Sequence, residues 1–118
     1  MTAFAAILLA ATSLNITIWP NGHDHAAKHS FTLKCAPVGG TLPHRRAACR
    51  QLAKLKAPFA PVRKDLVCTE IYGGPAEALI TGRFRGGLVR ARFNLKNGCE
   101  IGRWNQLRFL LGSAPNSS

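Results

Sequence analysis

Acidic residues are scarce in this chain, and so are long apolar runs. Only five of its 118 residues are Asp or Glu, against 16 Lys or Arg, which gives a formal net charge of +11 at pH 7. This imbalance predicts attraction to anionic surfaces, acidic proteins or nucleic acid, and does not choose among them. The apolar run at residues 3–11 (AFAAILLAA) is too short to cross a bilayer as a helix, so we expect no stable membrane insertion.

The chain also lacks the residue combinations of an enzyme or of a zinc site. Three of its four histidines, His23, His25 and His29, lie in a polar stretch that we expect to be a solvated loop, and His44 lies at an expected helix start. No serine or free cysteine joins them in a recognisable catalytic motif, so we expect no enzyme activity. No two cysteines have the short spacing of a zinc knuckle, and we expect no metal and no cofactor.

The four cysteines predict disulfides instead. They permit three pairings, of which the sequential one, Cys35 with Cys49 and Cys68 with Cys99, is the simplest. In the chain-entropy treatment, loops of this size each stabilise the fold by about 3–4 kcal/mol. A chain of this length forms one domain with a modest core, and small secreted domains commonly depend on such cross-links.

The two ends of the chain differ in composition from the folded domain that we expect between them. The run at residues 3–11, followed by Thr12 and Ser13, is similar to the apolar part and small-residue end of a signal peptide, although it lacks a basic start. The alternative is a buried first strand or helix. We therefore expect a signal-peptide remnant at residues 1–11, a folded domain at 12–112, a polar tail at 113–118, and a secreted, extracellular protein.

Alternating apolar and polar residues predict half-buried strands in much of the domain. These strands are expected at residues 13–19, 31–35, 77–84 and 88–95. From His44 onward, apolar residues recur at helical spacing opposite a face of Arg and Lys, and Pro58 ends this helix. Residues 35–43 are expected to be irregular, and residues 104–111 to form a helical turn followed by a strand.

Residues 68–75 (CTEIYGGP) are the most informative segment. Thr69, Ile71 and Tyr72 favour extended backbone, and the Gly-Gly-Pro that follows bends the chain away. A disulfide at Cys68 would hold this segment as a stiff, exposed loop. A stiff extended loop has the shape that a protease binds.

Two cysteine motifs in this chain resemble the signature of the Streptomyces subtilisin inhibitor family. Residues 35–43 (CAPVGGTLP) and 48–52 (ACRQL) are similar to the family's Cys-x-Pro, Gly-x-His-Pro and Ala-Cys-x-x-Leu, with Leu42 in place of the histidine. Residues 68–72 resemble its reactive-site segment. Its later strands are matched by Gly82, Phe84, Gly86, Phe93, Asn97, Cys99 and Glu100. The resemblance spans roughly residues 13–111.

The resemblance implies an α+β fold: a five-stranded antiparallel sheet with two helices packed on it and two sequentially paired disulfides. It also implies a secreted homodimer that inhibits serine proteases. By position after Cys68, the reactive bond would be Glu70–Ile71, with Thr69 and Cys68 on its acyl side and Tyr72 on the other. Cys68, Thr69, Tyr72 and Gly73 would form the protease-binding loop around it.

The acidic side chain of Glu70 narrows the expected target. A trypsin-type pocket carries its own carboxylate and should reject it. The expected partner is therefore a subtilisin-like protease with an open pocket, or a Glu-preferring one. Residues 73–75 (GGP) depart from the Asp-Pro-Val that follows the tyrosine in the best-known members.

Two other functions remain open from the sequence. Residues 83–87 (RFRGG) resemble an RGG element, which would fit a basic secreted domain that binds an anionic polymer or acidic protein and no longer inhibits. Further arginines that could extend this patch are Arg90, Arg92, Arg103 and Arg108. Disulfides argue against a nucleic-acid role inside a cell, so a nucleic-acid partner is not expected. The third function is a structural or dimerising domain that proteases cleave without resealing.

Overall fold

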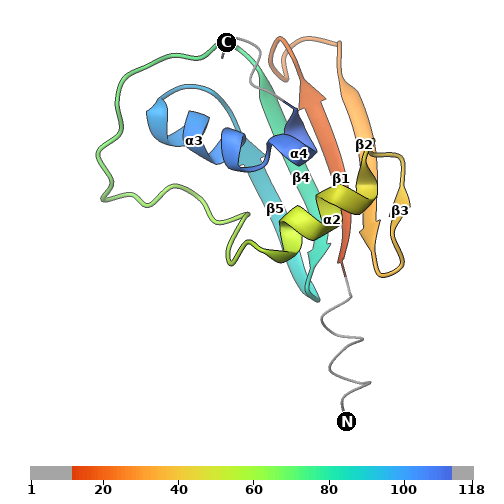
Figure 1. The fold of residues 1–118 in the computed structure, drawn as a ribbon. Helices are drawn as coiled ribbons and strands as arrows, with labels where there is room; N and C mark the ends of the chain where they lie inside the picture. The colour runs from red at the N-terminus through yellow and green to blue at the C-terminus, as the bar shows by residue number, and fades with distance from the viewer. Residues whose placement is uncertain (1–11, 113–118) are drawn as a thin grey trace.

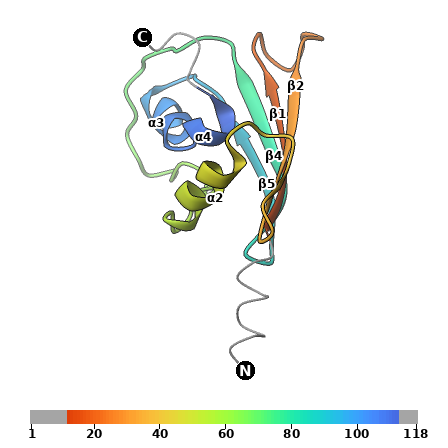
Figure 2. The same cartoon turned by 45° about the vertical axis from the view of Figure 1, so that its right-hand side comes forward.

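The computed structural model describes residues 12–112, which form one antiparallel sheet with helices against one of its faces (Figure 1). The strands lie side by side in the order β3-β2-β1-β4-β5. Their bounds are β1 (Thr12–Trp19), β2 (His29–Cys35), β3 (Gly39–Gly40), β4 (Glu77–Phe84) and β5 (Gly87–Phe93). The helices are α2 (Arg45–Ala53), α3 (Gly98–Gln106) and α4 (Arg108–Leu111). All three lie on the same side of the sheet, and its other face is open (Figure 2).

The core lies between the sheet and the helices because the strands alternate. In the central strand β1, Leu14 and Ile16 are buried while Ser13 and Asn15 are exposed. The helices add Trp104 and a set of smaller side chains, and the Trp104 indole donates a hydrogen bond to the Gly112 carbonyl at 3.0 Å. The remaining core residues on the helices, and on the residue between α3 and α4, are Ala48, Leu52, Leu107, Leu110 and Leu111.

The expected α+β fold is confirmed. Four of the five strands fall on the predicted segments, with small differences at their ends. The fifth is β3, two glycines inside the segment that we expected to be irregular, where Gly40 pairs with Leu33. The helix predicted from His44 is α2, which stops at Ala53, before Pro58.

The prediction for residues 104–111 was wrong in part. A helix, α3, begins earlier, at Gly98, and residues 108–111 continue as the short helix α4 rather than as a strand. The Asn97 side chain accepts a hydrogen bond from the Glu100 N–H at 3.0 Å and so caps the first turn of α3. The apolar side chains that follow are buried against the sheet at helical spacing, which decides between helix and strand.

Both disulfides follow the sequential arrangement. Cys35–Cys49 joins the end of β2 to α2, with 5.8 Å between the Cα atoms. Cys68–Cys99 joins the segment before β4 to the first turn of α3, with 5.4 Å between the Cα atoms. The first bridge therefore connects a strand to a helix, and the second connects a loop to a helix.

The expectations for the chain ends concern residues that the structure does not describe. The signal-peptide remnant at residues 1–11 and the polar tail at 113–118 both lie outside the described residues. Within residues 12–112, no helix is long and apolar enough to cross a membrane.

Candidate functional site

A long segment without helix or strand connects α2 to β4 and arches past α3 (Figure 1). Most of the large apolar side chains that the described residues expose lie on it: Leu66, Val67, Ile71 and Tyr72. Val67 is 95 % exposed, Ile71 59 % and Tyr72 66 %. Exposed apolar side chains gathered on one segment are typical of a binding surface.

The backbone of this segment is held on both sides of Glu70 and Ile71. Before them, the Thr69 carbonyl accepts a hydrogen bond from the Gly98 N–H at 2.9 Å, next to the Cys68–Cys99 bridge. After them, the Gly73 N–H donates to the Leu95 carbonyl at 2.7 Å. The residues between these two attachments, 70–72, are exposed. We call residues 68–73 the clamped loop.

Two glycines allow the clamped loop to approach α3 closely. A Cβ atom on Gly98 would overlap the Thr69 hydroxyl oxygen. A Cβ atom on Gly73 would lie 3.0 Å from Ile101 Cδ1 and 3.1 Å from Leu95 Cβ, which is tighter than ordinary contact. The backbone hydrogen bonds that hold the loop therefore require these positions to lack a side chain.

The chain that leaves the clamped loop is attached to the turn between β1 and β2. Glu77 Oε1 accepts a hydrogen bond from the His23 N–H at 2.8 Å and lies 2.7 Å from His23 Nδ1. Partial burial opposes ionisation of Glu77, but the backbone and side-chain hydrogen bonds from His23 and the charges of His23 and Lys96 outweigh it. These contacts hold the pKa of Glu77 below its ordinary value.

Arg103 of α3 supports the chain that approaches the clamped loop. Its Nε donates to the Ala60 carbonyl at 3.0 Å, and its Nη1 donates to the Arg92 carbonyl at 3.0 Å and to Glu100 Oε1 at 2.9 Å. Its guanidinium carbon lies 4.2 Å from the centroid of the Phe93 ring. Only 13 % of the Arg103 side chain is exposed, so this arginine is a tether between loop, strand and helix.

The basic patch expected around residues 83–87 forms only in part, because Arg83 shares the open face of the sheet with Arg90 and Arg92 but Arg103 does not. Arg90 and Arg92 are exposed on the open face of the sheet, whereas Arg103 lies on the helical side under the loop. The RFRGG residues form an ordered turn, in which Arg85 covers the Phe84 ring at 4.4 Å. Phe84 in turn packs edge-on against Phe59 at 5.3 Å.

Sequence reasoning found the clamped loop but missed most of what holds it. It gave Gly98, Leu95 and His23 no part in holding the loop, and it placed Arg103 in a surface patch. One local signal was present, since Asn97 followed by Glu100 is a typical start of a helix and would have predicted where α3 begins. Within residues 12–112, no group of three or more His, Cys, Asp or Glu side chains is placed to hold a metal ion.

Comparisons with known proteins agree with this architecture. The family model described as "Subtilisin inhibitor-like" matches residues 10–97. The subtilisin inhibitor of Streptomyces violaceus is 33 % identical over 103 residues, covering 82 % of this chain and 70 % of that protein. Subtilisin inhibitor-like protein 5 of Streptomyces fradiae is 35 % identical over 75 residues, covering 61 % of this chain and 69 % of that protein.

A solved structure shows the same fold. Streptomyces caespitosus sermetstatin, crystallised in complex with Bacillus licheniformis subtilisin, superposes with a TM-score of 0.50 at 24 % identity, covering 80 % of this chain and 94 % of that one. The family match extends over most of the sequence and includes the clamped loop and the two strands that follow it, β4 and β5. The chain therefore belongs to the subtilisin inhibitor-like family, a family of protease inhibitors and not of enzymes.

Proposed function

We propose that this protein is a secreted serine-protease inhibitor that binds its target as a substrate does, with Glu70–Ile71 as the reactive bond. The observation that carries this proposal is the loop geometry: three exposed residues have a backbone hydrogen bond on each side and a disulfide just before them. The relatives named subtilisin inhibitor support a subtilisin-like target. The choice of bond is supported by its position after Cys68, which matches the reactive-site segment that residues 68–72 resemble.

In this mechanism the extended loop would pair with an edge strand of the protease. The protease serine would attack the carbonyl carbon of Glu70, and the amine of Ile71 would be the leaving group. The Gly73–Leu95 hydrogen bond and the Cys68–Cys99 bridge would hold both new chain ends in place. The amine would then reseal the bond faster than water could hydrolyse the acyl-enzyme.

Rigidity also explains how a short loop could bind tightly. A flexible peptide loses backbone and side-chain freedom when a protease orders it, whereas the clamped loop is ordered before binding. Its exposed apolar side chains would be buried in the complex, and a few of them would supply most of the affinity. Val67, three residues before Glu70, is placed to enter an apolar subsite.

Glu70 restricts the targets that fit. Its carboxylate would face the carboxylate of a trypsin-type pocket, and a closed hydrophobic pocket would have to desolvate the charge. The proposed partners are therefore a subtilisin-like protease whose pocket stays hydrated, or a Glu-preferring serine protease. A homodimer is part of this proposal, supported by the open face of the sheet, which a second copy could cover (Figure 2).

A titration of residual protease activity tests the proposed bond. The oxidised protein and Glu70→Lys would each be titrated against subtilisin, a Glu-specific serine protease and trypsin. We expect the unmodified protein to inhibit one of the first two, and Glu70→Lys to gain inhibition of trypsin. Asp65→Lys makes the same charge change outside the clamped loop and should leave the profile unchanged.

Two outcomes would contradict the proposal. Failure of both proteins to inhibit any of the three enzymes would exclude this function. Inhibition that Glu70→Lys does not redirect would show that another bond is the reactive one.

A further inference from the structure

The charges of this protein are distributed unevenly over its surface. Four of the five acidic residues lie around the clamped loop and its attachments: Asp24, Glu70, Glu77 and Glu100. The fifth, Asp65, pairs with Arg63 at 2.7 Å. Helix α2 carries no acidic residue and has four basic ones if the residue that ends it is included.

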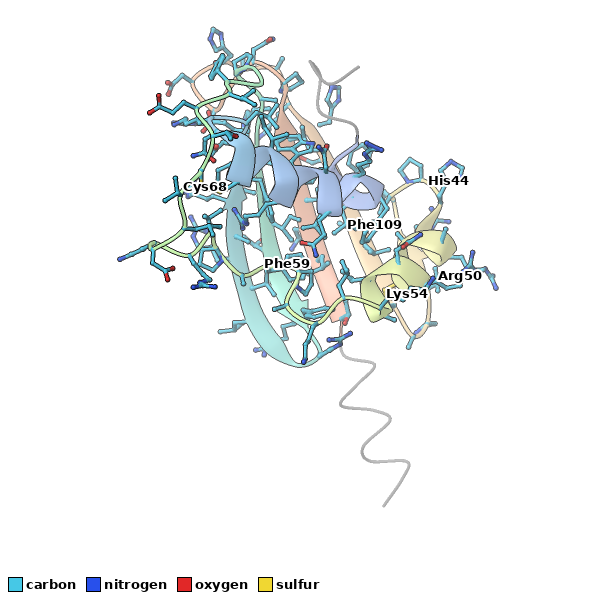
Figure 3. All side chains as sticks on the ribbon, turned by 60° about the vertical axis from the view of Figure 1, so that its left-hand side comes forward. His44, Arg50, Lys54, Phe59, Cys68 and Phe109 are labelled. Carbon is cyan, nitrogen blue, oxygen red and sulfur yellow. A yellow bond between two sulfur atoms is a disulfide. The ribbon has the colours of Figure 1, made fainter. Side chains whose placement is uncertain are left out.

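Three of these basic residues form a stripe along α2. Arg46, Arg50 and Lys54 are spaced four residues apart, so they lie on the same side of the helix, with about 6 Å of rise between neighbours. All three are exposed. Figure 3 shows Arg50 extending away from the protein, on the opposite side of the molecule from Cys68 at the root of the clamped loop. We call these three residues the α2 basic face.

Nothing in the described part of the chain neutralises the α2 basic face. Four ion pairs form among residues 12–112, and none of them includes Arg46, Arg50 or Lys54. Like charges four residues apart repel one another along a helix. Arg46 also lies in the first turn, where the helix dipole favours acidic residues, and this turn contains none. Arg50 and Lys54 lie at the C-terminal end of α2, where the helix dipole favours cations, and this gain offsets the repulsion. The stripe therefore adds little to helix stability, and folding alone does not account for it.

The chemistry of this surface selects a class of ligand. Two of its three residues are arginines, whose planar guanidinium groups bind phosphate oxygens in pairs. Within the described residues, α2 exposes no large apolar side chain that could enter a lipid layer. A repeated row of cations without an apolar border fits a hydrated chain of closely spaced phosphates better than a membrane.

We propose that the α2 basic face binds a phosphate-rich polyanion and that the clamped loop stays accessible in that complex. The polyanion would neutralise the three unpaired cations and release its own counterions, so binding would depend steeply on salt. Because the face and the loop lie on opposite sides (Figure 3), a protein held on such a polymer could still bind a protease.

The test measures binding to fluorescently labelled long-chain polyphosphate across a range of salt concentrations. The variant Arg46→Gln/Arg50→Gln/Lys54→Gln is compared with Arg83→Gln/Arg90→Gln/Arg92→Gln, which removes the same charge from the open face of the sheet. Both lower the net charge from +11 to +8, so any difference reports the position of the charges. We expect the α2 variant to bind about tenfold more weakly and with a shallower salt slope, and the sheet variant to change little.

Thermal unfolding separates binding from folding. The α2 variant should melt at about the same temperature as the unmodified protein, because the substitutions remove both the repulsion within the helix and the favourable interaction of Arg50 and Lys54 with its C-terminal end. If both variants bound polyphosphate equally weakly, net charge alone would explain the binding, and the proposal would be overturned. Binding to anionic vesicles without binding to polyphosphate would also overturn it.

A last measurement addresses the accessible loop. The protein, with and without saturating polyphosphate, is titrated against a protease that it inhibits, and the inhibition should be unchanged. Loss of inhibition on polyphosphate binding would show that the polymer covers the loop. The binding arm does not depend on inhibition, so failure of the proposed function and failure of this inference can be told apart.

Discussion

The Thr69 carbonyl oxygen accepts a hydrogen bond from the Gly98 N–H at 2.9 Å, although the two residues are far apart in the sequence. The Thr69 side chain lies directly over the Cα atom of Gly98, so closely that a Cβ atom would overlap its hydroxyl. This contact brings the loop backbone onto the first turn of α3, beside the disulfide at Cys99. The position of the proposed reactive bond therefore depends on a residue of the helix beneath it.

Gly98→Ala should displace the clamped loop. The added methyl group must push Thr69 away, and overpacking of this kind costs about 1–3 kcal/mol of folding stability. We expect inhibition to weaken by about tenfold or more, since a shift of the loop also breaks the Thr69–Gly98 hydrogen bond. The inhibition constant and the melting temperature measure both effects.

Gly102→Ala is the matched control in the same helix. Nothing lies within 4 Å of a Cβ atom at this position, so the substitution should stabilise α3 slightly and leave inhibition unchanged. Equal inhibition constants for Gly98→Ala and Gly102→Ala would show that the close approach at Thr69 does not position the loop.

Removal of the Cys68–Cys99 bridge should convert the inhibitor into a substrate. The variant Cys68→Ser/Cys99→Ser should lose about 3–4 kcal/mol of stability in the chain-entropy treatment and release one attachment of the loop. Incubation with the target protease followed by mass spectrometry should show complete cleavage between Glu70 and Ile71.

The other disulfide separates stability from inhibition. Cys35→Ser/Cys49→Ser removes a bridge of similar energy that lies between β2 and α2, away from the loop. This variant should be destabilised by about 3 kcal/mol and still inhibit at temperatures where it is folded. If both double variants were cleaved equally fast, general instability rather than the loop attachment would explain the cleavage.

The Glu77–His23 contact should make folding stability depend on acid pH. The pKa of Glu77 is held below its ordinary value, so the unfolded chain takes up the proton at a higher pH than the folded one. The stabilisation is present above that value and is lost as the pH falls through the lower pKa of the folded state. Urea unfolding at several pH values between about 3 and 6 measures this dependence.

Glu77→Gln should flatten the acid side of this profile, because Gln keeps an oxygen acceptor but does not titrate. Glu70→Gln removes a carboxylate that takes part in none of the ion pairs of residues 12–112, and serves as the control. A profile for Glu77→Gln that matches the unmodified protein would show that this contact does not contribute to the acid dependence.

Arg103→Ala should destabilise the protein by about 2–4 kcal/mol. The substitution removes hydrogen bonds to the Ala60 and Arg92 carbonyls and leaves the partly buried Glu100 without its partner. Arg103→Lys keeps the charge but cannot reach all three partners, and should recover only part of the loss. Chemical denaturation measures the effect, and Arg90→Ala, on the exposed face of β5, should change stability by less than about 0.5 kcal/mol.

The strands were predictable because their signal is local. The alternation of Leu14 and Ile16 with Ser13 and Asn15 identifies both a strand and its buried face, and the structure places them accordingly. β3 was not predictable, since two glycines carry no strand pattern and pair only because β2 presents a free edge to them. α4 was taken for a strand because a short apolar run fits either structure until packing decides.

By itself, the sequence determined the family, the four main strands, helix α2 and the segment that contains the proposed reactive bond. These features depend on residue spacing, on backbone preferences within a few residues, and on cysteine motifs that survive in the linear chain. Only the tertiary structure decided what holds the loop: Gly98 under Thr69, Leu95 behind Gly73, and Arg103 reaching Ala60. These contacts join segments that are distant in sequence, and no local preference encodes them. They form because the sheet and α3 pack together and bring their backbones within hydrogen-bond distance.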